Sequence, residues 1–326
     1  MWAQHARDAR LNVTYTVHTV DFPVPFPLTE AEIEGLRAER LAAMVAAEEL
    51  PGNAPEEAPD AAAPDPLAGV DLAAIATERA VARGKHLVDS RYFCTACHGE
   101  DFGGGTMIDA PPMGKILGRN LTSGAGGVVA SYTVANWDAV VRHGVKPDGR
   151  PTVMPSEDFA AMSDHELSDI LAYIRSLPPV DRDVPVPAWG PIGTMLLATH
   201  QLRLTAEHVP HDVPHAVAPP NPGDTLAFGK HLAATCRGCH GPEFAGGPIV
   251  GGDPAWLPAA NLTPTGLTGW TYDDFVAVMR EGQKKSGGGV GVPMNEVIPW
   301  TRRATDEELA AMWAYLQTLP PAATPE

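Results

Sequence analysis

Residues 94–98 read CTACH, and 142 positions later residues 236–240 read CRGCH. The two stretches contain all four cysteines of the 326-residue chain, and in each a histidine directly follows the second cysteine. Two thiols at this spacing lie close together on one turn. There they can form a disulfide, bind zinc or an iron-sulfur cluster, or attach to the vinyl groups of a haem.

The histidine that ends each stretch favours haem over the other groups. Cys-x-x-Cys-His is the c-type haem attachment signature, in which the histidine ligates the iron. A four-cysteine zinc site would have to join both pairs and would leave both histidines unexplained. Thioredoxin-like redox chemistry needs a βαβ setting, which the sequence lacks. We therefore expect two covalently attached haems c, with thioether links at Cys94, Cys97, Cys236 and Cys239 and iron ligands at His98 and His240.

The two motifs lie inside an internal repeat, in which shorter matches occur in the same order in both halves. The matches are GKHL at 84–87 and 229–232, NLT at 120–122 and 261–263, and LPP at 177–179 and 319–321.

Each half also contains two matched helix patterns. Residues 132–144 and 270–282 are amphipathic and end in a glycine, the usual helix stop. Later in each half, Ser163 and Thr305 precede an acid three residues on, which is the pattern of a capping box that opens a helix. No sustained alternation of apolar and polar residues predicts strands. We expect an all-α fold of two tandem domains with long loops.

The predicted organisation has four parts: an N-terminal extension at 1–70, a first domain at 71–180, a Pro-rich linker at 181–225 and a second domain at 226–326. Within the otherwise extended N-terminal part, a capping box of Thr29 and Glu32 predicts a helix over 29–50. An acidic Pro/Ala stretch at 51–69 is expected to be disordered. The linker histidines are irregularly spaced among prolines and are expected to be ordinary surface residues rather than metal ligands; they are His200, His208, His211 and His215.

A methionine thioether is the expected sixth iron ligand, because it favours ferrous iron and closes the site. In the first half we favour Met154, which lies in the loop between the two later helices, far enough along the chain from His98 to reach the other haem face. The alternatives are Met107 and Met113, in the loop close to the attachment motif, and Met162, at a helix start.

In the second half we favour Met294, because its separation from His240 along the chain nearly equals that of Met154 from His98. Met279 and Met312 lie within predicted helices and are expected in the core. If the Met-Pro pair of the first half instead aligns with Ile298-Pro299, the ligand position holds an isoleucine and the second iron is open.

With these motifs placed, residues 71–321 resemble the class I cytochrome c fold, twice over. The resemblance is to two-haem cytochromes that are often membrane-anchored electron carriers, or cytochrome subunits of dehydrogenases and respiratory complexes. It implies electron transfer between a donor and an acceptor, with no catalytic residues in this chain. One alternative is a peroxidase-like haem enzyme with one open iron; another is a structural module that binds metal through Cys and His.

Charge and hydropathy limit the partners. The net charge of −17 excludes nucleic acid as the main partner, and no apolar run is long enough to span a bilayer. The first residues, MWAQHARD, lack the apolar segment of a signal peptide. Covalent haem attachment nevertheless implies export to the periplasmic side of a bacterial membrane, so we expect an upstream segment that these residues do not include. The expected partners are redox proteins of a membrane complex, with the membrane reached through such an N-terminal anchor or through a partner.

Overall fold

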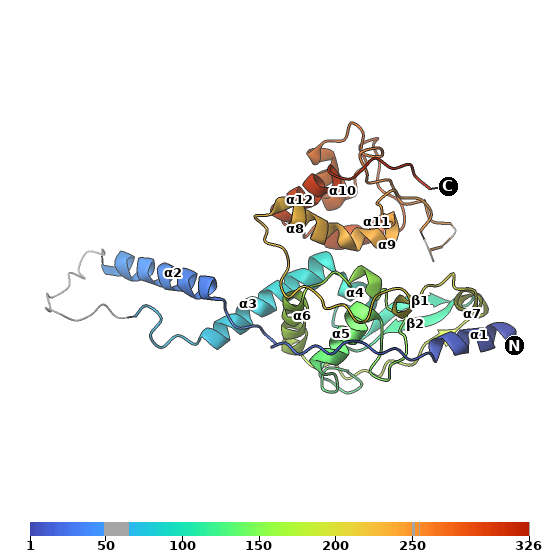
Figure 1. Ribbon diagram of the computed structural model, residues 1–326, viewed down its shortest axis with the longest axis horizontal. Helices are drawn as coiled ribbons and strands as arrows, with labels where there is room; N and C mark the ends of the chain where they lie inside the picture. The colour runs from blue at the N-terminus through green and yellow to red at the C-terminus, as the bar shows by residue number, and fades with distance from the viewer. Residues whose placement is uncertain (49–64, 250–251, 254, 326) are drawn as a thin grey trace.

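The structure is a computed structural model that describes residues 1–48, 65–249, 252–253 and 255–325. Two helical domains follow one another in the chain and lie against each other, with α8 and α12 of the second domain above α3 and α4 of the first in the view of Figure 1. Across the described parts of the chain, none of the helices combines the length and the apolar character that crossing a bilayer requires.

The elements follow the predicted repeat. The N-terminal part and the first domain contain α1 (Trp2–Leu11), α2 (Glu30–Glu48), α3 (Leu72–His86), η1 (Leu87–Arg91), α4 (Cys94–His98), β1 (Gly105–Ala110), β2 (Gly114–Gly118), α5 (Val134–His143), η2 (Ser156–Asp158) and α6 (Asp164–Ser176). The linker and the second domain contain β3 (Ala188–Trp189), α7 (Pro191–Ala198), η3 (Thr205–Glu207), α8 (Thr225–Ala233), η4 (Ala234–Cys236), α9 (Arg237–His240), α10 (Tyr272–Glu281), α11 (Met294–Thr301) and α12 (Asp306–Leu316).

In each domain the first and last helices cross at the repeated glycine of GKHL. A Cβ on Gly84 of α3 would lie 2.0 Å from the carbonyl oxygen of Asp169 in α6. A Cβ on Gly229 of α8 would lie 1.9 Å from the carbonyl oxygen of Ala311 in α12. Only glycine permits this approach, which explains why both halves carry it.

The predicted helix boundaries agree closely with the structure. Thr133 and Thr271 cap α5 and α10, and Gly144 and Gly282 end these helices in the left-handed conformation, with φ of 69° in both. The capping boxes that begin at Ser163 and Thr305 are formed at α6 and α12. Local sequence signals therefore determine where these helices begin and end.

The expectation of an all-α fold is not confirmed, although the chain is mostly helical. β1, β2 and β3 form a three-stranded antiparallel sheet in the order β1-β2-β3. The hairpin of β1 and β2 lies in the glycine-rich loop that follows the first attachment motif, and β3 comes from the linker. The strands are too short and too glycine-rich to show a detectable alternation of apolar and polar residues. The pairing of β2 with β3 also depends on the linker, which follows the first domain in the sequence.

The N-terminal part contains one unpredicted helix, α1, which packs against α7 of the linker. Arg10 of α1 donates two hydrogen bonds to the Glu207 carboxylate, at 2.8 and 2.5 Å. The Thr29 and Glu32 capping box is formed at α2. Most of the stretch expected to be disordered lies outside the described residues, and residues 65–69 of it form a turn.

The expectation of surface histidines in the linker is correct for two residues and wrong for two. His200 and His208 are exposed. His211 and His215 are partly buried and lie against His143 at the end of α5. The linker folds back onto the first domain, and irregular spacing in the sequence does not reveal such a contact.

Candidate haem sites and the interface between them

The first attachment motif forms the single turn α4, which follows Phe93 in the left-handed conformation with a φ of 52°. Burial raises the pKa of the Cys94 thiol to about 12. The Nδ1–H of His98 donates a hydrogen bond of 2.8 Å to the carbonyl oxygen of Arg119. Since a carbonyl can only accept, this bond leaves the lone pair on Nε2, the nitrogen available to iron.

The second motif repeats this arrangement on η4 and α9. Burial raises the pKa of the Cys236 thiol to about 11. The Nδ1–H of His240 donates to the carbonyl oxygen of Ala260 at 2.7 Å. Burial also lowers the pKa of both His98 and His240, which keeps the imidazoles in the neutral form that binds iron.

The NLT and LPP repeats hold the loop that accepts these histidine bonds. Asn120 directly follows Arg119, and its side-chain amide donates to the carbonyl oxygen of Val180 at 2.7 Å. Asn261 directly follows Ala260 and donates in the same way to Ala322 at 2.8 Å. Val180 and Ala322 each follow the repeated Leu-Pro-Pro. The NLT and LPP repeats therefore fix the carbonyl that orients the histidine of each attachment motif.

Each histidine faces an apolar cavity. The first has a volume of about 150 Å³ and the second about 390 Å³. The first is lined by Cys94, Cys97, His98, Met107, Met154 and Met162, together with aromatic and aliphatic side chains. Two thiols, a neutral imidazole and an apolar lining are the donor set and surroundings that a covalently attached haem requires.

Met154 lines the cavity of His98, as do Met107 and Met162. The backbone of Met154 is held on both sides, since Thr152 Oγ1 accepts from the Met154 N–H at 3.3 Å and the Met154 carbonyl oxygen accepts from the Ser156 N–H at 2.8 Å. Met162 is a core residue with 2% exposure. Met113 does not line the cavity and contacts the linker instead, where its carbonyl accepts from the N–H of Gly190.

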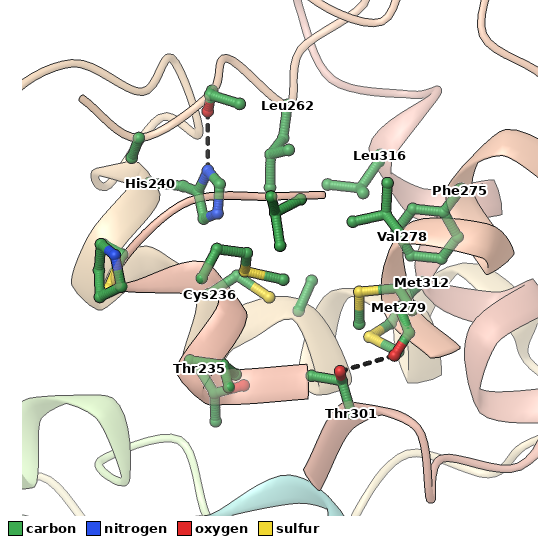
Figure 2. Close-up of a pocket in the computed structure, with 18 of the residues that line it drawn as sticks. Thr235, Cys236, His240, Leu262, Phe275, Val278, Met279, Thr301, Met312 and Leu316 are labelled. Atoms are coloured by element: carbon green, nitrogen blue, oxygen red, sulfur yellow. Dashed lines mark hydrogen bonds between the residues drawn. The ribbon is translucent and has the colours of Figure 1, made fainter. Parts of the chain in front are cut away.

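Three methionines line the second cavity. Figure 2 shows Cys236 and His240 on one side of it and Met279 and Met312 on the other. These two methionines belong to α10 and α12 and are each 8% exposed, as expected of core residues. Met294, the third, is the first residue of α11 and is partly exposed.

Backbone hydrogen bonds show which residues of the loop after α5 correspond to which residues of the loop after α10. The N–H of Thr152 donates to the carbonyl oxygen of Gly144, and the N–H of Val290 donates to that of Gly282, at 2.8 Å in both. Ten residues after the glycine, the first loop has Met154-Pro155 and the second has Val292-Pro293. The equivalent of Met154 is therefore Val292, and Met294 lies two residues further on. Ile298, the alternative from sequence, does not line the cavity.

The second loop is also four residues longer, and the extra length forms part of α11. This helix reaches the first attachment motif. Trp300 donates from Nε1 to the Thr95 hydroxyl at 2.9 Å, and its ring lies 5.6 Å from that of Phe93. Phe93 itself lines both cavities.

The first domain covers the second motif in return. Asp158 lies against this motif, where a Cβ on Gly238 would be 2.5 Å from its carboxylate. Each attachment turn is therefore covered by the other domain.

Two reciprocal His–Glu contacts join the domains. His231 of the second domain contacts the Glu166 carboxylate at 2.9 Å, and His86 of the first contacts Glu308 at 2.9 Å. The histidines are those of the GKHL repeat, and the glutamates are those of the capping boxes. Equivalent residues of the two domains therefore exchange roles across the interface, as in an approximate two-fold arrangement.

The pair at Glu166 is the more buried of the two. Arg91 donates to Glu166 at 2.5 Å, and the two side chains are 7% and 6% exposed. Burial raises the pKa of the Glu166 carboxyl, but His231, Arg91 and the backbone N–H of Ser163 together lower it to about 2. Burial likewise raises the pKa of Glu308, but the contacts with His86 and Thr305 leave it below its ordinary value.

Comparison with protein families identifies these domains. The sequence model of the cytochrome c family matches residues 81–178 and 226–320, together more than half of the chain. The chain belongs to the cytochrome c family. Cytochrome c domains bind haem c covalently and transfer electrons, so the expected class of cofactor and function is confirmed at this level.

Curated relatives of this cytochrome include subunits of dehydrogenases. The cytochrome c subunit of the quinone alcohol dehydrogenase of Komagataeibacter europaeus is 30% identical, over 70% of this chain and 52% of its own length. The fructose dehydrogenase cytochrome subunit of Gluconobacter japonicus is 26% identical, over 78% of this chain and 57% of its own length. A dihaem c-type cytochrome of Cereibacter sphaeroides is 26% identical, over 70% of this chain and 82% of its own length. The chain thus spans about half the length of the two dehydrogenase subunits.

Sequence reasoning missed the residues between the two sites. Phe93 and Trp300 are single aromatic residues with no pattern around them. His86 and His231 did carry a signal, because both lie in the GKHL repeat. A histidine repeated in two domains, with no role inside either, is the pattern expected of a contact between them.

Proposed function

We propose that this chain relays electrons through two haems c, as the cytochrome component of a dehydrogenase-type redox complex. The observation that carries the proposal is Phe93, which lines both cavities and leaves the two sites separated by one side-chain layer. Electron donors and acceptors can then bind at different domains, while transfer between the haems takes place inside the chain.

In this proposal each haem would be held by two cysteines, through thioether links, and by two iron ligands. The first haem would be held by Cys94, Cys97, His98 and Met154, and the second by Cys236, Cys239, His240 and Met294. When bound, the haems supply the redox couple. The protein orients the histidines through the carbonyl oxygens of Arg119 and Ala260 and keeps water from most of the macrocycle with apolar side chains.

A haem enzyme with one open iron is the second candidate, and one observation favours it. The residue in register with Met154 is Val292, which has no ligand atom, and the second cavity is the larger. The proposals differ in whether Met294 reaches the iron from the start of α11.

The deciding experiment uses the full chain, exported and matured with haem. A pyridine haemochrome assay should give two haems per chain; one haem or none would overturn the relay. The ferric spectrum should contain the Met-to-iron charge-transfer band from both haems.

The matched variants for this test are Met294→Leu and Met279→Leu. We expect Met294→Leu to remove about half of the band and to open one ferrous haem to carbon monoxide, whereas Met279→Leu keeps the full band. If the unmodified protein already binds carbon monoxide at one haem and shows half the band, the open-iron enzyme is the correct assignment.

We also propose export to the periplasmic side of a bacterial membrane and assembly with a dehydrogenase. Covalent haem attachment supports the location, and the named relatives support the partner. Purification from native membranes in mild detergent should recover the chain with a larger redox subunit. Recovery of a cytosolic, haem-free chain would contradict both statements.

A further inference from the structure

Outside the haem sites, three histidines converge from distant parts of the chain. They are His18 of the N-terminal segment, His143 at the end of α5 and His215 of the linker, and one ring nitrogen of each lies within 4.8 Å of the others. His143 is fully buried, and the Nε2 atom of His18 is buried without a hydrogen-bond partner.

The hydrogen bonds around two of these histidines fix their tautomers. His18 has Nδ1 at 2.9 Å from the carbonyl oxygen of His211, and His215 has Nδ1 at 3.0 Å from that of Ala160. Because carbonyl oxygens only accept, both Nδ1 atoms carry the proton. In the neutral imidazole the lone pair is then on Nε2.

The tautomer of His143 follows from its contact with His211. His211 donates from Nε2 to the carbonyl oxygen of Ala206 at 3.0 Å, so its Nδ1 is an acceptor. The Nδ1 atom of His143 lies 3.2 Å from that acceptor and must therefore be the donor. His143 is left with its lone pair on Nε2, which faces Nε2 of His215 at 2.9 Å.

The Nε2 lone pairs of His143 and His215 thus face each other at 2.9 Å beside the ring of His18, which is unfavourable unless a cation lies between them. Asp138 lies beside this cluster. Its Oδ1 accepts from Arg142 at 2.6 Å, but its Oδ2 is buried without a hydrogen-bond partner and lies 3.8 Å from His143 Nε2.

We propose that the three histidines bind one Zn²⁺ ion. Zinc takes imidazole and carboxylate ligands in tetrahedral sites, and bond lengths of about 2.0–2.1 Å separate the ligand atoms by about 3.3 Å. The 2.9 Å between two of the nitrogens is close to that value. The outer ring nitrogens of His18 and His215 already donate to backbone carbonyls, as zinc-bound histidines generally do.

The bound ion joins three segments that are far apart in the sequence. It ties the N-terminal segment and the linker to α5, whose Trp137 and Val140 line the first haem cavity. The carbonyl of Ala160, which accepts from His215, belongs to the loop between α5 and α6 that also contains Met154. The ion therefore has a structural role, which is to hold this loop over the first haem.

The test uses the full, haem-loaded chain without a histidine tag. After dialysis against a chelator, metal analysis and calorimetric titration with Zn²⁺ should give one ion per chain. X-ray absorption at the zinc edge should show a shell of nitrogen and oxygen ligands at about 2.0 Å with no sulfur.

The test variants are His18→Ala and His215→Ala, with His208→Ala as the matched control on the same linker. We expect the first two to weaken Zn²⁺ binding by at least about 100-fold and the control to bind normally. Failure of the parent protein to bind one equivalent overturns the proposal, as does equal binding by all variants. Stoichiometric uptake of Cu²⁺ with no uptake of Zn²⁺ overturns the assignment to zinc.

Discussion

At the residue scale, the two candidate haem sites are equal on the histidine side and unequal on the opposite side. His98 and His240 make the same carbonyl bond, at 2.8 and 2.7 Å. Met154 lies in a loop that is fixed by hydrogen bonds. Its counterpart in the second domain is Val292, so a thioether ligand for the second iron would have to come from Met294, at the start of α11. A thioether raises the reduction potential, so this difference is expected to separate the potentials of the two haems.

We predict that Met154→Ala removes the Met-to-iron band of the first haem and lowers its reduction potential. The loss of the thioether destabilises the ferrous form, and the shift should be a sizeable part of the ~0.8 V range that axial ligands span. Spectroelectrochemical titration measures both. The control is Met162→Leu, a volume-conserving change at a core position of the same cavity, which should keep the band. A retained band in Met154→Ala would rule out this ligand.

Glu166 illustrates how one side chain can serve a helix cap, a buried ion pair and the domain interface together. We predict that Glu166→Gln lowers the free energy of unfolding by about 3 kcal/mol, because it leaves Arg91 buried without its counter-charge. Calorimetry should show a lower Tm. Glu308→Gln is the comparison, since its partner His86 is 35% exposed and water can replace the contact. Equal effects of the two variants would contradict the role given to burial.

At the scale of elements, the first and last helices of each domain form both the core and the interface. The glycine of GKHL lets α3 meet α6 and α8 meet α12, and the histidine two residues later reaches the other domain. The capping boxes of α6 and α12 supply the partners. Duplication of one domain therefore supplies both halves of the interface.

The His86–Glu308 contact predicts a pH dependence of stability. The hydrogen bond to Glu308 raises the pKa of His86. The contribution of protonated His86 to the free energy of unfolding is therefore fully present below the unfolded pKa of 6.5 and is lost as the pH rises through the folded pKa. Although burial acts in the opposite direction, the contacts with His86 and Thr305 lower the pKa of Glu308. The contribution of the Glu308 carboxylate to the free energy of unfolding is therefore present above its unfolded pKa of 4.5 and is lost as the pH falls through the folded pKa.

The Tm difference between the parent protein and His86→Gln should accordingly be largest between about pH 4.5 and 6.5 and should shrink on either side. Glutamine is the chosen replacement because it can still donate a hydrogen bond but cannot carry the charge. Calorimetry across this range makes the measurement. A Tm difference that does not vary with pH would show that the charge on His86 contributes nothing.

At the scale of the whole molecule, the two domains enclose the haem attachment turns between them. Trp300 covers the first turn and Asp158 the second, so the turns face the interface. The net charge of −17 then acts on the approach of partners. It favours a basic redox partner, whose encounter is accelerated by long-range attraction.

We predict that reduction by a soluble cytochrome of positive net charge slows about tenfold or more between ionic strengths of about 0.01 M and 0.15 M. Over this range the screening length falls from about 30 Å to about 8 Å. Stopped-flow absorbance measures the rate. A neutral hydroquinone is the control reductant, for which the rate should hardly change. A salt-independent rate with the basic cytochrome would contradict electrostatic steering.

The sequence by itself determined the features whose signal is local. The attachment motifs, the capping boxes and the glycines after α5 and α10 each depend on residues within a few positions, and the repeat placed them in matched order. The candidate site was predictable on the histidine side for the same reason. A methionine loop was also predictable, because the length of chain after His98 sets its reach.

Only the tertiary structure decided what depends on distant contacts. The register that pairs Met154 with Val292 comes from backbone hydrogen bonds, and the spacing that favours Met294 in the sequence does not reveal it. The approach of His18, His143 and His215 joins the N-terminal segment, α5 and the linker, which are far apart in the sequence. Such contacts form when long loops close, and loop closure is determined by packing across the whole chain, which leaves no periodic pattern around any one residue.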